Sequence, residues 1–203
     1  MSEGVVIVAY GERARLQAGY NLAALRNSGE ARPVLVVGDE IVRGARYIFV
    51  QQNDPGGRLA KLSLDLLVPF SAFCYLDADT RPAVKLDVGF DALRDGFDLV
   101  ICPSSAEEFL WRVGEAERDE TAALYQTTAL TVLQGGVWWA RKSPDVARFF
   151  AAWREEWARY RDQDQGALLR ALHRVPLKVW LLSRDWNGGR LIAHLHGQAR
   201  ALQ

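Results

Sequence analysis

The stretch AFCYLDADTRP, residues 72–82, places two aspartates one residue apart, directly after a short apolar run. Two carboxylates held this close repel each other, and taking them out of water costs free energy unless another group compensates. One interpretation is a surface turn that caps a strand, and the other is a site for a divalent cation. Paired hard oxygen ligands suit Mg²⁺ or Mn²⁺, which also take ligands from a phosphate-bearing substrate. The motif alone is weak support, because a second Asp-x-Asp pair occurs at Asp162 and Asp164.

The elements around this pair alternate between strands and helices. Continuous apolar runs of strand length are typical of strands buried on both faces, and they occupy 4–10, 32–39, 45–51, 72–76, 97–103 and 135–141. Helical periodicity or helix-start signals fall between and after these runs, at 14–29, 58–70, 90–96, 144–160 and 163–173. Two late strands are expected at 177–183 and 190–195. This order predicts an α/β fold with a mainly parallel central sheet flanked by helices.

Ligands of open α/β sheets bind beyond the carboxyl ends of the strands. Asp77 and Asp79 lie at such an end, which favours the cation interpretation. In the first helix, the expected apolar face consists of Leu16, Tyr20, Ala23 and Ala24. Asp162 with Gln165 fits a capping box for the helix at 163–173.

The composition is that of one ordinary globular domain, expected to span 1–203. Basic and acidic residues balance at 25 each, so no overall field attracts nucleic acid or a membrane. We find no run long enough to span a bilayer and no signal-peptide core. Cys74 and Cys102 lie in apolar strands and are expected to be buried free thiols of a cytoplasmic protein. The charged stretch 104–126 is predicted to be a loop with helical turns.

The segment RLAKLSLDLLVPFSAFCYLDADT resembles the core of glycosyltransferase family 8, the family that includes glycogenin. There, a helix with a Lys-Leu pair leads into a strand that ends in Asp-Ala-Asp-Thr, and here Lys61 precedes Asp77 by sixteen residues. Four weaker matches follow in the family's order: QGGVWWARKSP (134–144), DQGALL (164–169), DWN (185–187) and HLHGQAR (194–200). The resemblance covers roughly the whole chain and implies a GT-A (Rossmann-like) fold.

The resemblance also implies roles for individual residues. The metal ligands would be Asp77, Asp79 and His194, with Asp77 also near the ribose. The donor diphosphate would meet Lys61, Ala78, Gly197 and Arg200, the last standing where the family has Lys. The nucleoside would meet Ala9, Tyr10 and Gly11, with Tyr10 or Tyr20 against the base. The sugar pocket would contain Gln134, in place of the family's Asn, together with Gly135, Asp164 and Gln165. Asp164, Gln165 and Lys61 are the candidates for catalysis.

Several of these residues also have a purely structural interpretation. Lys61 fits a solvated helix position, and Asp164 falls in a first helical turn, where the macrodipole favours a carboxylate. His194 and His196 share one face of an alternating strand, and either fits a packed or surface position. Trp138 and Trp139 face opposite sides of their strand, and we expect both in the core.

The function implied is transfer of a sugar from a nucleotide diphosphosugar, a UDP-sugar in particular, with retention of configuration and with Mn²⁺ or Mg²⁺ as cofactor. The acceptor stays open between glycan, small molecule and protein, with nucleic acid ranked lower, and a homo-oligomer stays open as well. One alternative is a nucleotidyltransferase, although the stretch AYGERAR (9–15) matches a Gly-rich phosphate loop poorly. Another is a non-catalytic nucleotide-sugar-binding module. The Arg-rich stretch 141–161 is the only local support for a nucleic-acid acceptor.

Overall fold

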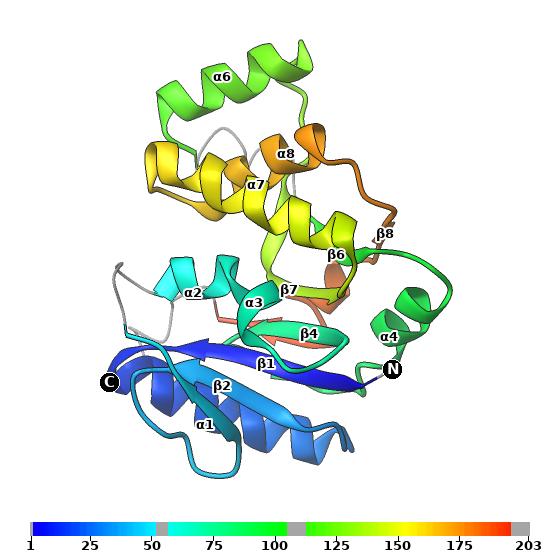
Figure 1. Ribbon diagram of the computed structural model, residues 1–203. Helices are drawn as coiled ribbons and strands as arrows, with labels where there is room; N and C mark the ends of the chain where they lie inside the picture. The colour runs from blue at the N-terminus through cyan, green and yellow to red at the C-terminus, as the bar shows by residue number, and fades with distance from the viewer. Residues whose placement is uncertain (1, 52–56, 105–112, 196–203) are drawn as a thin grey trace.

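A computed structural model describes residues 2–51, 57–104 and 113–195. Seven strands form one sheet in the order β3-β2-β1-β4-β7-β6-β8 (Figure 1). Their bounds are β1 Glu3–Ala9, β2 Val34–Gly38, β3 Arg46–Phe49, β4 Ala72–Asp77, β6 Leu99–Pro103, β7 Leu133–Arg141 and β8 Val179–Leu181. Every pairing is parallel except those of β7 with β4 and β6, which are antiparallel. The predicted mainly parallel α/β sheet is therefore confirmed.

Helices cover both faces of this sheet (Figure 1). Their bounds are α1 Gly11–Asn27, α2 Arg58–Leu62, α3 Leu64–Leu67, α4 Asp87–Arg94, α6 Glu115–Tyr125, α7 Pro144–Tyr160, α8 Asp164–Arg174 and the 3₁₀ helix η2 Arg184–Trp186. α1 and α4 pack with Trp139 on one face, whereas α2, α3, α7 and α8 pack with Trp138 on the other. Both tryptophans are fully buried, as expected for core residues on opposite sides of one strand.

A small second sheet pairs β5 (Thr80–Pro82) with β9 (Ile192–His194) in antiparallel register, with Thr80 opposite His194. β5 follows Asp77 and Asp79 directly, whereas β9 comes from the end of the described chain. This pairing brings two segments far apart in sequence to the carboxyl end of β4.

Two expectations about helices were wrong in detail. The buried face of α1 contains Ala18, Asn21, Leu22 and Leu25, whereas Leu16 and Tyr20 are more than half exposed. A polar residue takes part in the buried face because Asn21 Nδ2 donates to the Asp77 carbonyl and to Thr80 Oγ1. The capping box before α8 does not form either: its N-cap is Gln163, whose side chain makes no capping bond.

The charged segment 104–126 contains a regular helix, α6, rather than only turns; residues 105–112 lie outside the described residues. The buried residues of α6 are polar, and Glu117 pairs with Arg170 of α8 at 2.8 Å. Arg170 is itself buried and also pairs with Glu156 of α7 at 3.0 Å. An ionic contact with α8, not an apolar stripe, fastens α6, so the hydrophobic pattern does not mark it.

The expected N-cap of α7 and the buried cysteines are confirmed, whereas the helix expected over 58–70 is interrupted at Ser63 and ends at Leu67. Ser143 caps α7 by accepting from the Val146 N–H, with Pro144 at the first helical position. Cys74 and Cys102 are buried free thiols, and burial raises the pKa of Cys102 to about 12. Among the described helices, none combines the length and apolar character needed to cross a bilayer.

Candidate active site

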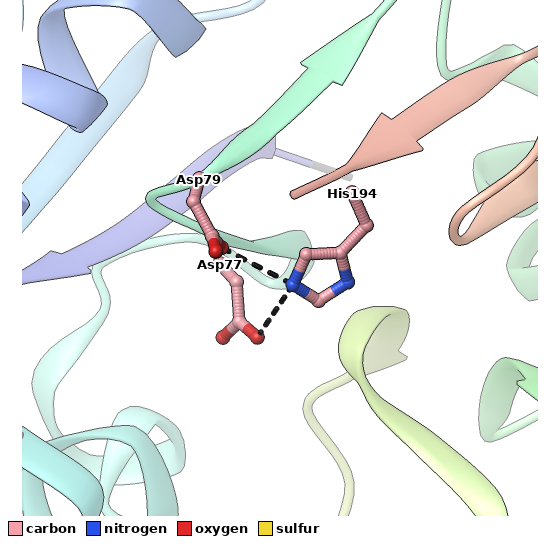
Figure 2. A group of neighbouring side chains, drawn as sticks. All are labelled: Asp77, Asp79 and His194. Carbon is pink, nitrogen blue, oxygen red and sulfur yellow. Dashed lines mark ion pairs between the residues drawn. The ribbon is translucent and has the colours of Figure 1, made fainter. Parts of the chain in front are cut away.

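The two aspartates lie at the turn between β4 and β5, and buried side chains fix the backbone of this turn by hydrogen bonds. Thr80 Oγ1 donates to the Asp77 carbonyl at 2.8 Å, and Asn21 Nδ2 donates to the same carbonyl at 3.0 Å. Asn21 and Thr80 are both fully buried. Because these contacts use only the backbone oxygen of Asp77, its carboxylate remains directed outward from the turn, beside that of Asp79 (Figure 2).

His194 meets these carboxylates from β9 (Figure 2). Its Nε2 lies 3.4 Å from Asp77 Oδ2 and 3.1 Å from Asp79 Oδ1, and the ligand atoms of all three residues lie within 4.8 Å of one another. The structure therefore brings together the three residues that the family resemblance proposed as metal ligands.

The surroundings of this Asp-Asp-His group fit a divalent cation. Two carboxylates and an imidazole are a donor set suited to Mn²⁺ or Mg²⁺ at a site that also receives phosphate oxygens. The strand β7 passes close by with Gly136, where an added Cβ would lie 2.4 Å from His194 Cε1 and 2.8 Å from Asp77 Oδ2. Only a glycine leaves this space open, so the chain keeps room beside His194 and Asp77.

A buried ion pair lies next to this group. Lys61 of α2 and Asp164, the first residue of α8, approach to 2.5 Å, and both are buried. Burial alone would raise the pKa of Asp164, but the Lys61 ammonium outweighs it, so the pKa lies below the ordinary value. An added Cβ on Gly135 would lie 2.9 Å from Lys61 Nζ. Lys61 is thus not a solvated helix residue; it is a charge held at the site by a partner.

Tyr75, which was not among the residues proposed from the sequence, connects the ion pair to the aspartates. Its hydroxyl donates to Asp77 Oδ1 at 2.6 Å, and Lys61 Nζ lies 5.0 Å above its ring. The ring stacks on Trp138 with 5.1 Å between centroids. Burial, followed by the negative charge of Asp77, raises the pKa of Tyr75 well above its usual value, so the hydroxyl stays a donor. Its position in the sequence could have identified it, because Tyr75 and Asp77 are two residues apart on one strand and so share a face of the sheet.

These groups line one cleft of about 820 Å³, a volume in the range of small-ligand sites. Ten residues proposed from the sequence line it: Tyr10, Lys61, Asp77, Ala78, Asp79, Gln134, Gly135, Asp164, Gln165 and His194. Lining residues that were not proposed include Arg13 and Gln17 of α1, Arg58 of α2, Tyr75, Gly136 and Gln163. The cleft therefore joins the carboxyl end of β4, the start of β7 and the first turns of α1, α2 and α8.

The remaining proposed residues lie elsewhere. Tyr20 is more than half exposed beneath the Arg81 guanidinium, and it does not line the cleft. Ala9 is buried in the core, and Gly11 donates its N–H to Asp39, so neither lines the cleft. Gly197 and Arg200 lie outside the described residues.

In comparison with solved structures, the fold is similar to the GT-A fold of several glycosyltransferases. The chain matches the apo form of mouse xyloside xylosyltransferase 1 with a TM-score of 0.60 and 12% identity, over 92% of this chain and 87% of that one. It matches an active-site mutant of LgtC with a TM-score of 0.61 and 17% identity, over 90% and 73%. It matches the bifunctional glycosyltransferase WbbM with a TM-score of 0.66 and 12% identity, over 91% and 39%.

At these identities the likeness establishes the fold. Searches against family models and against curated protein sequences found no match. The proposed fold class is confirmed, whereas membership of family 8 and the roles of the individual residues stay predictions.

Proposed function

We propose that the chain is a metal-dependent glycosyltransferase that takes a sugar from a nucleotide diphosphosugar, with a UDP-sugar as the first donor to test. The observation that carries this proposal is the convergence of Asp77, Asp79 and His194 in a cleft that also holds the buried Lys61–Asp164 pair. The fold neighbours named as glycosyltransferases support it.

In this proposal Asp77, Asp79 and His194 hold Mn²⁺ or Mg²⁺. A bound divalent cation neutralises the negative charge that develops on a departing nucleoside diphosphate. The protein's own positive charges act on the same phosphates: Arg13, Arg58 and Lys61 line the cleft on the side of α1 and α2. Such side chains bind the diphosphate and fix its orientation in the cleft.

The sugar would lie against the starts of α8 and β7. Gln134, Gln165 and Asp164 are buried groups at the wall of the cleft that can bond to sugar hydroxyls. Asp164 stays ionised because Lys61 lowers its pKa, so its charge suits an oxocarbenium-like face of the reacting sugar. Retention of configuration is part of the proposal and is tested by the anomeric form of the product.

A donor panel tests the function. We expect UDP with Mn²⁺ to raise the melting temperature through binding linkage, and one or more UDP-sugars to release UDP slowly by hydrolysis or rapidly when an acceptor is present. Asp79→Ala should abolish UDP release and keep the circular dichroism spectrum, whereas Asp95→Asn, an exposed carboxylate in the loop after α4, should match the wild type.

The outcomes separate the alternatives. Pyrophosphate release from a nucleoside triphosphate would indicate a nucleotidyltransferase instead. Nucleotide binding without any turnover of the sugar donors would indicate a binding module. An Asp79→Ala variant with the full wild-type rate would refute the metal site.

A further inference from the structure

The ring of His194 is fixed by one buried side chain. His194 Nδ1 lies 2.6 Å from the side-chain oxygen of Asn187, on the far side of the ring from the two aspartates. Asn187 follows η2 directly and is 5% exposed, and the His194 side chain is 7% exposed. The contact is therefore shielded from water.

This contact favours one tautomer of the ring. An amide oxygen accepts hydrogen bonds and cannot donate, so with the Asn187 oxygen facing the ring, Nδ1 is the donor. In the neutral imidazole the lone pair then belongs to Nε2, the nitrogen that faces Asp77 and Asp79. Three electron-pair donors converge on one point, which is the state a cation requires of its ligands.

The loop that carries Asn187 is built to hold it in place. Trp186 packs edge-to-face on Trp139 of β7, with 5.9 Å between ring centroids. The chain then returns so closely that a Cβ on Gly189 would lie 2.4 Å from the Cα of Asp185. The same loop leads into β9, so the segment 185–194 positions both the histidine and the group that orients it.

Burying Asn187 at this position destabilises the fold unless its side-chain oxygen makes a favourable contact. Its amide nitrogen is buried and has no hydrogen-bond partner among the described residues, and a buried unsatisfied donor costs free energy. An apolar side chain would avoid that cost. The contact with His194 is the gain that offsets it.

We propose that Asn187 is a positioning residue: it holds His194 in the tautomer that leaves Nε2 free of a proton and directed at the cation site. The inference rests on the proposed function, because it assigns the histidine to metal binding. It adds a residue that touches neither metal nor substrate and that acts through the ring alone.

The test is Mn²⁺ binding by the whole chain, measured by calorimetry with and without UDP, together with the ¹⁴N modulation that a coordinated imidazole gives in pulsed electron paramagnetic resonance of Mn²⁺. Asn187→Leu should raise the Kd for Mn²⁺ about 10–100-fold and weaken the ¹⁴N signal. Asn187→Asp keeps an acceptor oxygen and should retain both. Asn187→Ala repeats the test without added bulk, so that a misfit of leucine does not decide the result.

The inference is overturned if Asn187→Leu and Asn187→Ala bind Mn²⁺ like the wild type with an unchanged ¹⁴N signal. It is also overturned if Asn187→Asp loses affinity as much as they do, since the loop and not the acceptor oxygen would then matter. The variant Asp79→Asn distinguishes failure of the Asn187 inference from failure of the proposed function. If the wild type takes up no more Mn²⁺ than Asp79→Asn, the metal site itself is refuted; if only Asn187 proves neutral, the inference alone falls.

Discussion

A methyl group added at Gly136 should prevent metal binding at the proposed cation site by steric displacement alone, because all three proposed ligands keep their side chains. The Cβ of Gly136→Ala would lie 2.4 Å from His194 Cε1, 2.9 Å from His194 Nδ1 and 2.8 Å from Asp77 Oδ2. Non-bonded carbon atoms need about 3.5 Å, so the imidazole has to withdraw by roughly 1 Å. Ligand distances at a metal tolerate only about 0.2 Å, so His194 can no longer act as a ligand.

The expected loss follows from that displacement. Removing a hydrogen-bond partner of a metal ligand already lowers affinity about 10–100-fold. Displacing the ligand itself should therefore cost about 100-fold or more in the Kd for Mn²⁺, equivalent to about 2.7 kcal/mol. The measurement is calorimetric titration of Mn²⁺ without UDP, with UDP release from the donor as a second readout.

Gly135→Ala is the matched control on the same strand. Its Cβ would meet Lys61 Nζ at 2.9 Å and Asp164 Oδ1 at 3.1 Å, and no atom of the Asp-Asp-His group is among its nearest neighbours. We expect Mn²⁺ affinity measured without UDP to stay unchanged and donor turnover to fall, because only the ion pair is disturbed. Wild-type Mn²⁺ affinity in Gly136→Ala, or equal losses in both variants, would refute the reasoning.

Two further predictions concern stability. The folded-state pKa of Asp164 lies below its unfolded value, so the Lys61–Asp164 pair stabilises the fold fully above about pH 4 and progressively less as the pH falls through the folded pKa. Between about pH 5 and pH 2, the urea midpoint should therefore fall more steeply for the wild type than for the double variant Lys61→Met/Asp164→Leu. Parallel curves for the two proteins would contradict this. Gly19 lies inside α1 with nothing within 4 Å of an added Cβ, so Gly19→Ala should raise the free energy of unfolding by about 0.5–1 kcal/mol in urea titrations, whereas a lowered value would show a contact at this position that the structure lacks.

The central strands of this fold could be predicted because burial on both faces leaves a direct mark on the sequence. β1 and β2 are buried from Gly4 to Ala9 and from Val34 to Gly38, and each forms an uninterrupted apolar run. Helices with polar buried faces leave no such mark. The buried face of α1 contains Asn21, so it differs from the expected apolar face. α6 packs on α8 through the ion pair of Glu117 with Arg170, two residues that a hydrophobic pattern counts as exposed.

The site was predictable in part for a similar reason. Asp77 and Asp79 are recognisable by type and by their place after a strand, whereas their partner His194 lies more than a hundred residues away and was proposed only through the family resemblance. Tyr75, Gly136 and Asn187 act by orienting a neighbour or by leaving space. Their value depends on register and on loop closure, which no spacing along the chain reveals.

The reversed direction of β7 explains why glycines are needed where they occur. In a wholly parallel sheet, the strand beside β4 would bring its own carboxyl end to Asp77, followed by a loop. Because β7 is antiparallel to β4, with Val137 opposite Leu76, its beginning lies there instead, and the chain enters the sheet through the cleft at Gln134, Gly135 and Gly136. Side chains at the last two positions would fill the space next to the ion pair and next to the aspartates. The topology thus places two glycines between two charged groups: Gly135 faces the Lys61–Asp164 pair, and Gly136 faces His194 and Asp77.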